Sequence, residues 1–264
     1  MSATYLYCLV RRPEAPELAG APQGVPGALP PRLLDVGDQL WLVAAQVPLP
    51  EYGEAEIASR LEDLSWVSER ALAHEEMVEH FARAAPAGAP AETGHWALLP
   101  MKLFTLFASD ERAVQHVAGE LPRLRRVLDR VAGREEWGVR VRRSPERAAA
   151  AAGEAPAGRP ASGREFLAQK HRQLEAARRA PAEAREVAEN AYARLVERAA
   201  EALRREPEAG TSLVLDAAFL VPRSDRGPFA DAVAAVAREL AGAACELTLT
   251  GPWPPYNFAG EEER

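Results

Sequence analysis

An Ala-, Gly- and Pro-rich segment, Pro145–Pro160, interrupts the sequence and most constrains how the chain can fold. It offers little side-chain surface to bury and is typical of a linker. The chain has 264 residues, which suits about two domains, and 47% of its residues are apolar, enough for a core in each. We therefore expect an N-terminal domain at 1–144, a linker at 145–162 and a C-terminal domain at 163–264. The strand predicted at 135–143 could also join the second sheet.

Strand and helix patterns alternate in the first part of the chain. The β-favouring run Thr4–Val10 predicts an opening strand, and Gly37-Asp38 predicts a tight hairpin between the runs 33–36 and 39–47. The segment 54–85 has helical periodicity, and either one bent helix or two helices with a break near Asp63 is allowed. Its apolar positions are Ile57, Leu61, Leu64, Val67, Leu72, Val78 and Phe81.

The remaining segments continue this mixture. Two short apolar runs within 95–107 predict adjoining strands or one bent strand. Ser109 is a suitable N-cap for a helix that extends to about Gly133, with a kink or a restart near 119–122. Strands are predicted at 136–142, 213–221 and 245–249, and a helix is predicted at 228–240. The S-x-x-E pattern of Ser162 and Glu165 predicts the start of a long helix that reaches about Arg205. This mixture favours an α+β fold, with sheets covered by helices.

Charge and composition exclude several classes of function. The chain has 32 basic and 39 acidic residues, a net charge of -7, which argues against a nucleic-acid-binding surface over the whole molecule. Apolar runs such as Leu40–Ala45 are far shorter than the roughly 18–20 residues of a membrane-spanning helix, so no membrane span is expected. The first residues lack the basic and apolar regions of a signal peptide, which predicts a cytoplasmic protein. Cys8 and Cys245 are expected to be buried, unreactive thiols.

Motifs for catalysis and cofactor binding are missing from the sequence. It contains neither of the glycine-rich phosphate-binding patterns G-x-x-x-x-G-K-[ST] and G-x-G-x-x-G, and it contains no G-x-S-x-G nucleophile turn. No cofactor and no catalytic residue is therefore predicted. His74 and His80 are six residues apart, about 120° around a helix, whereas a zinc-binding pair needs four-residue spacing. No metal site is therefore predicted. The alternative from another functional class is a small-molecule enzyme that gathers His74, His95 and distant acidic residues between its domains.

The C-terminal segment is the most informative part of the sequence. It leaves the last predicted strand as proline-restricted chain that carries Trp253, Tyr256 and Phe258. These aromatic side chains could fold back and cover the protein's own core. They could also contact a partner, because rigid aromatic groups bury a large area at a small cost in conformational entropy. Both interpretations remain open at this point.

Several segments carry a resemblance to a known family. The tail sequence G-P-W-P-P-Y-N-F resembles the terminal signature of the gas vesicle protein family GvpF/GvpL. Other matching segments occur in the expected order, and they are T-Y-L-Y-C-L-V, A-H-E-E-M-V, L-L-P-M-K-L-F-T-L-F, E-W-G-V-R-V, G-R-E-F-L-A-Q-K and A-A-F-L-V-P. The resemblance therefore extends over nearly the whole chain.

This resemblance implies a gas vesicle assembly or accessory protein that is not an enzyme. It implies two α+β domains, of which at least one is ferredoxin-like, and we expect this fold in the C-terminal domain. It also implies binding to the hydrophobic shell protein GvpA and to other accessory proteins, a cytoplasmic location before incorporation, and presence in some cases as a minor vesicle component. A soluble protein that reversibly covers apolar surface could keep such a shell subunit competent for assembly.

Overall fold

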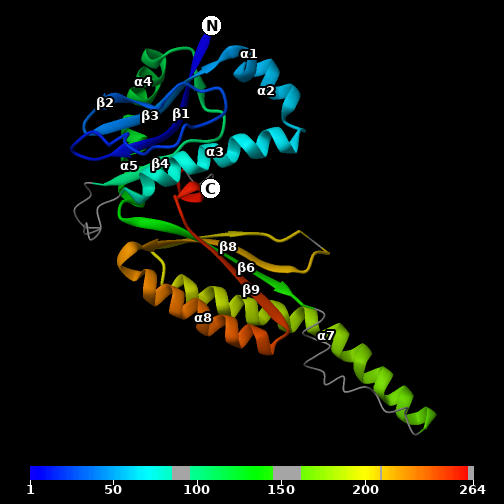
Figure 1. Cartoon of the computed structure of the whole chain (residues 1–264). Coiled ribbons are helices and arrows are strands. Elements are labelled where there is room, and N and C mark those ends of the chain that lie inside the picture. The colour runs from blue at the N-terminus through cyan, green and yellow to red at the C-terminus, as the bar shows by residue number, and fades with distance from the viewer. Residues whose placement is uncertain (85–95, 145–161, 209, 261–264) are drawn as a thin grey trace. The chain divides into compact units, whose positions relative to one another are not determined.

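The computed structural model describes residues 1–84, 96–144, 162–208 and 210–260 (Figure 1). The chain divides into two compact units, of which the first consists of Met1–Glu135 with Trp253–Arg264 and the second of Glu136–Pro252. This division differs from the domain boundaries expected from composition at two places. The strand at 134–143 lies in the second sheet, which was the alternative left open, and the aromatic tail belongs to the first unit. The linker expected at 145–162 lies, except for its last residue, outside the described residues.

The first unit is built on an antiparallel sheet whose central strand is β1. The strand order is β2-β3-β1-β4, and β5 also pairs with β1. The hairpin expected around Gly37-Asp38 is present as β2 and β3, and the two short apolar runs form β4 and β5. The strands are β1 Ser2–Arg11, β2 Arg32–Gly37, β3 Leu40–Pro48, β4 Ala97–Pro100 and β5 Leu106–Phe107.

Helices cover both faces of this sheet, and this explains why β1 is buried almost throughout. Side chains alternate along a strand, so Tyr5 reaches His74 on one face, while the Thr4 hydroxyl donates to Asp110 at 2.6 Å on the other. The first face is covered by α3, and the second by α4 and α5. The helices of the unit are α1 Leu49–Tyr52, α2 Glu54–Arg60, α3 Leu64–Arg83, α4 Asp110–Gly119 and α5 Leu121–Val131.

Two helix breaks follow from local chemistry. The segment 54–83 forms two helices, because the Asp63 side chain accepts a hydrogen bond from the Trp66 backbone N–H and starts α3. Of the kink or restart expected near Pro122, the structure has the restart, because α4 ends at Gly119 and α5 begins at Leu121. Pro122 lies in the first turn of α5, where its missing N–H costs no intrahelical hydrogen bond, and Ser109 caps α4 as expected.

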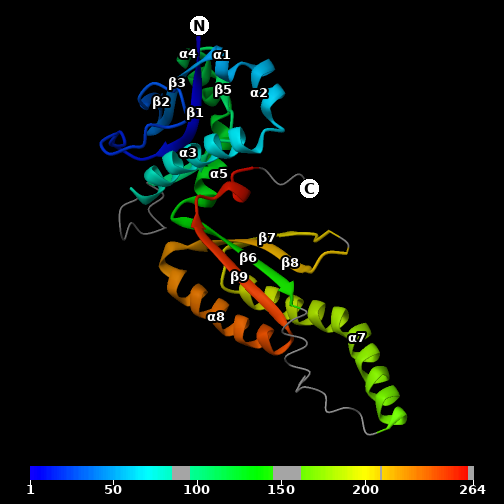
Figure 2. The same cartoon turned by 45° about the vertical axis from the view of Figure 1, so that its right-hand side comes forward.

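The second unit has the element order β-α-β-β-α-β. Its sheet has the strand order β7-β8-β6-β9, and both views show α7 and α8 on the same side of it (Figures 1 and 2). This order is compatible with the ferredoxin-like fold. Its elements are β6 Arg134–Arg143, α7 Gly163–Val196, β7 Glu201–Arg205, β8 Leu213–Pro222, the 3₁₀ turn η2 Arg223–Asp225, α8 Arg226–Gly242 and β9 Cys245–Trp253.

The core of the second unit lies between the sheet and its two helices. Alternate residues of β6 and β8, such as Val139 and Phe219, face Leu195 of α7 and Phe229 of α8. Arg140, on the opposite face of β6, is exposed to solvent. The arrangement is therefore an α+β structure with one helical layer, and the expected fold class is confirmed.

The long helix is shorter than the sequence predicts. It continues through Pro181 but ends at Val196, and Glu201–Arg205 forms β7 instead of a last helical turn. The prediction of a helix to about Arg205 was wrong, because pairing with β8 supplies hydrogen bonds that outweigh the helical propensity of an Ala-, Leu- and Arg-containing segment. None of the helices in the described parts of the chain combines the length and apolar character needed to cross a bilayer.

Candidate functional site

The tail residues lie in the first unit, at the end of the chain (Figure 2). After β9, Pro254 and Pro255 are buried, and Tyr256–Phe258 forms the 3₁₀ turn η3. The turn is closed by backbone hydrogen bonds from Tyr256 N–H to the Pro254 carbonyl at 2.8 Å and from Phe258 N–H to the Pro255 carbonyl at 3.2 Å. The tail is thus an ordered part of the unit.

The three aromatic side chains predicted as partner contacts have different surroundings. Phe258 is fully buried, and the guanidinium carbon of Arg130 on α5 lies 5.7 Å from its ring centroid. Tyr256 is partly buried and packs against the core on the α3 face, whereas Trp253 keeps 39% of its surface exposed. Two of the three therefore pack within the unit, and Trp253 has surface available to another molecule.

Tyr256 lies against the acidic side chain of Glu75 on α3. Burial raises the pKa of the Tyr256 hydroxyl, and the nearby Glu75 carboxylate raises it further. Burial also raises the pKa of Glu75, and Tyr256 partly offsets that rise. The two groups shift each other's pKa, although neither Tyr256 Oη nor Glu75 Oε1 has a partner in the geometry of a direct hydrogen bond. The contact therefore pairs a half-buried phenol of the tail with a half-buried carboxyl group of α3.

His74 occupies a closed cluster of tyrosines beneath α3. Its Nε2 lies 3.1 Å from the Met101 carbonyl oxygen, which can only accept, so Nε2 carries the proton. Its Nδ1 then accepts from the Tyr5 hydroxyl at 2.9 Å. The ring is 3% exposed, and burial lowers the pKa of His74 to about 4. Since both ring nitrogens have partners, His74 holds secondary-structure elements together and presents no free nitrogen to a substrate.

The same cluster fixes the irregular segment between β1 and β2. The Tyr7 hydroxyl accepts a hydrogen bond from the Val25 N–H at 3.0 Å, and burial raises the pKa of Tyr7 to about 12. Gly24 lies beside this hydroxyl with a φ of +84°, and a Cβ there would meet Tyr7 Oη at 2.2 Å. Only glycine lets the segment approach so closely.

Other sequence-based site hypotheses have mixed outcomes. His95, the second histidine of the enzyme alternative, lies outside the described residues. Within the described ranges no group of three or more His, Cys, Asp or Glu side chains could hold a metal ion. The expectation that Cys8 and Cys245 are buried is confirmed, and burial raises the pKa of both thiols.

The apolar positions that the helical spacing gives for the segment 54–85 are not all buried. Leu64 and Leu72 are 77% and 66% exposed, and Leu61, just before the helix, is also exposed. The buried face instead includes the polar residues Arg70 and His74.

Arg70 can be buried there because aromatic rings surround it. Its guanidinium carbon lies 4.0 Å from the Trp66 ring centroid and 5.6 Å from that of Tyr52. Its Nη1 also donates to Glu69 at 3.0 Å. With these polar side chains buried, the leucines are exposed to solvent, which the sequence did not reveal.

Comparisons with known proteins agree on one family. The family model described as "Gas vesicle synthesis protein GvpL/GvpF" matches residues 3–260. A protein from Streptomyces sp. (strain CB03234), described as gas vesicle protein L, is 35% identical over 272 residues, which cover 98% of this chain and 93% of the relative.

Two solved structures have a similar fold. The crystal structure of gas vesicle protein GvpF from Anabaena sp. PCC7120 has a TM-score of 0.68 at 18% identity, covering 100% of this chain and 98% of that one. The crystal structure of GvpF from Microcystis aeruginosa has a TM-score of 0.64 at 18% identity, covering 98% of this chain and 99% of that one. At these identities the two structures support the fold alone.

Proposed function

Since the chain belongs to the GvpL/GvpF family of gas vesicle synthesis proteins, we propose that it is a non-enzymatic assembly factor for gas vesicles. In this proposal it binds the hydrophobic shell subunit GvpA and other accessory proteins during vesicle nucleation or growth. It acts in the cytoplasm and is retained in part as a minor vesicle component. The family match over residues 3–260 is the observation that carries this proposal.

The surroundings of the chain's polar groups support a binding role over a catalytic one. The enzyme alternative requires His74 to face a substrate, but both of its ring nitrogens are engaged in a buried cluster. The family is one of gas vesicle proteins and is not a known enzyme family. A soluble binder would instead lower the aggregation risk of an apolar shell subunit by covering its surface until the subunit joins the wall.

Two exposed apolar features of the first unit are candidate contacts for the shell subunit. One is the leucine surface, which we define as Leu61, Leu64 and Leu72, and the other is Trp253 at the start of the tail. Tyr256 and Phe258 contribute by holding the tail in the unit. When a partner removes exposed leucine and tryptophan side chains from water, binding is favoured by roughly 25 cal/mol per Å² of buried apolar area.

Coexpression with the shell subunit followed by affinity purification tests the proposed function. We expect the two proteins to purify together and a strain that lacks this protein to form fewer or misshapen vesicles, as seen by electron microscopy. Normal vesicles in that strain, together with no association, would contradict the proposal. A reproducible turnover activity abolished by a single histidine or carboxylate replacement would favour the enzyme alternative.

Replacement of both Leu64 and Leu72 by alanine is expected to weaken association with the shell subunit by roughly tenfold or more, because both side chains would lose buried contact area. The unfolding midpoint should change little, since both leucines are exposed and alanine favours helix. Binding can be measured by biolayer interferometry with detergent-solubilised shell subunit. Leu29→Ala, which removes another exposed leucine of the same unit, is the matched control and should bind normally. Equal affinities of all three proteins would exclude the leucine surface as a contact.

Trp253→Ala is expected to reduce association while leaving the protein folded. Its side chain is 39% exposed, so the replacement should lower the free energy of unfolding by only about 1 kcal/mol. Loss of a tryptophan at an interface typically weakens binding by 2 kcal/mol or more, or roughly thirtyfold. Trp253→Phe should restore much of the binding. If Trp253→Ala binds the shell subunit as the parent protein does, the tail makes no contact with this partner.

A further inference from the structure

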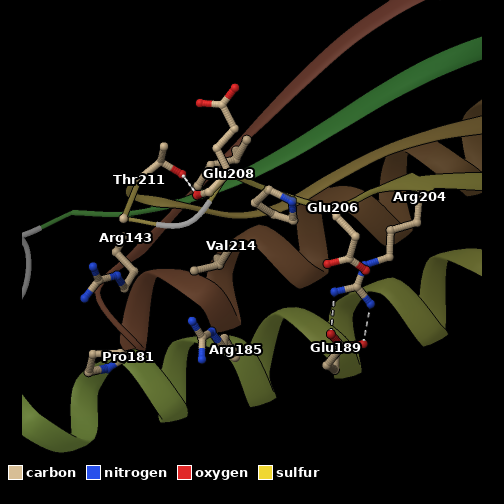
Figure 3. Close-up of a pocket in the computed structure, with 12 residues that line it drawn as sticks. Arg143, Pro181, Arg185, Glu189, Arg204, Glu206, Glu208, Thr211 and Val214 are labelled. Carbon is tan, nitrogen blue, oxygen red and sulfur yellow. Dashed lines mark hydrogen bonds and ion pairs between the residues drawn. The ribbon is translucent and has the colours of Figure 1, made fainter.

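A polar pocket lies in the second unit, and its lining residues include none of the tail residues and none of the leucine surface. It is formed by the middle of α7, the end of β6 and the hairpin of β7 and β8 (Figure 3). All of these elements belong to the same unit, so the positions of the pocket walls are defined by one fold. The pocket encloses about 400 Å³, within the range typical of ligand sites.

One half of the pocket is closed by a complete ion pair. Both terminal nitrogens of Arg204 donate to the Glu189 carboxylate, at 2.7 and 2.5 Å, and the pair is drawn at the right of Figure 3. These hydrogen bonds lower the pKa of Glu189. The Arg204 guanidinium carbon also lies 5.5 Å from the Tyr192 ring centroid, so the aromatic ring helps to hold the Arg204 side chain in the position that pairs with Glu189. Arg204 is therefore neutralised and held in place, and it has little capacity to bind another anion.

The other half of the pocket carries positive charge that no described carboxylate neutralises. Arg143 reaches into it from the end of β6, and Arg185 reaches into it from α7 (Figure 3). Among the residues that the structure describes, neither guanidinium forms an ion pair. Pro181 and Val214 line the same half and provide apolar surface beside the two charges. Arg143 and Arg185 thus line the same half of the pocket from two different elements, and an anion bound by both would accept several charge-assisted hydrogen bonds.

We propose that this half of the pocket binds the carboxylate of an acidic peptide segment from a partner protein. The guanidinium groups of Arg143 and Arg185 bind the carboxylate, and a neighbouring apolar side chain of the peptide lies on Pro181 and Val214. A polyphosphate or nucleic acid fits this site less well, because it carries more negative charge than Arg143 and Arg185 can neutralise, and glutamates equal in number to the arginines line the same pocket. The site is separate from the proposed shell contacts, so its test does not depend on them.

The experiment uses the full-length chain with ¹⁵N-labelled arginine and follows the side-chain Nε–Hε signals by NMR. The probe is the capped hexapeptide Gly-Leu-Glu-Glu-Leu-Gly, and its twin has glutamine in place of both glutamates. We expect the acidic peptide to shift the signals of Arg143 and Arg185, and the glutamine twin to leave them unchanged. Joint replacement Arg143→Gln and Arg185→Gln should weaken binding by roughly tenfold to a hundredfold, the effect of losing charge-assisted hydrogen bonds.

Arg178→Gln is the matched control, because Arg178 is an exposed arginine on the same helix and does not line the pocket. This variant should bind the acidic peptide as the parent protein does. Equal binding of the glutamine twin, unchanged affinity of the double variant, or no shift at millimolar peptide would each overturn the proposal. Tighter binding of inorganic pyrophosphate at the same two arginines would overturn it in favour of a phosphate site.

Discussion

Replacement of Phe258 by alanine is expected to lower the free energy of unfolding of the first unit by about 3–5 kcal/mol. The ring is fully buried, so the change removes its packing contacts and leaves a cavity close to Arg130 of α5. Thermal unfolding followed by near-ultraviolet circular dichroism should show the loss as a midpoint lower by several degrees or more.

Trp253→Ala provides the comparison, because it removes an exposed aromatic residue from the same tail. It should shift the midpoint far less than Phe258→Ala does. Phe258→Leu keeps much of the buried volume and should give an intermediate midpoint, which preserves the test if the alanine variant does not fold. Equal midpoints for Phe258→Ala and Trp253→Ala would show that the tail does not stabilise the first unit.

Stability is expected to fall by about 3 kcal/mol between pH 6.5 and pH 4 because of His74 alone. Burial lowers the pKa of His74 from 6.5 to about 4 in the folded protein, so the unfolded chain takes up a proton first as the pH falls. Above pH 6.5 His74 does not lower the free energy of unfolding. The loss of stability develops between pH 6.5 and pH 4 and does not grow further below about pH 4. Burial raises the pKa values of Tyr5 and Tyr7, the groups that face the imidazole, so both remain protonated.

Urea unfolding at a series of pH values measures this dependence. Because the pKa of Glu75 is raised in the folded protein, Glu75 increases stability as the pH falls, opposite to His74. The quantity to compare is therefore the pH dependence of the free energy of unfolding in the parent protein and in His74→Gln. Glutamine can donate to the Met101 carbonyl and accept from Tyr5, but it does not titrate. The variant should therefore lose stability less steeply between pH 6.5 and pH 4. His80→Gln, on the same helix, should retain the parent's slope, and identical slopes for all three proteins would exclude His74 as the cause.

Local signals in the sequence were sufficient for most elements of the fold. The hairpin at Gly37-Asp38, the cap at Ser109 and the restart at Pro122 follow from turn, capping and proline chemistry, which act over a few residues. The family resemblance followed from the tail and six other short segments, and the comparisons confirm it.

Features that depend on distant partners could not be predicted in the same way. Helical spacing gave Leu64 and Leu72 only as apolar positions of the segment 54–85, and it does not register that aromatic rings far along the chain can enclose Arg70 and His74. The segment Glu201–Arg205 has helical propensity, and only its pairing with β8 makes it a strand.

The proposed pocket was missed for the same reason. Arg143 and Arg185 are separated by the segment 145–161 and most of a helical stretch, and no local pattern relates them. A sequence in which arginine is common gives such a pair no distinguishing signal, so only the assembled sheet and helix bring the two side chains to one pocket.

Placement of Phe258 in the unit that begins with Met1 has a consequence for biosynthesis. Translation delivers β1 long before the tail, so the earliest strands wait for this packing partner until the second unit, Glu136–Pro252, has been made. We expect ribosome-stalled chains that lack 253–260 to be cleaved by protease within 1–135, whereas released full-length chains resist. The core of the first unit would then be completed only after the whole second unit has been synthesised.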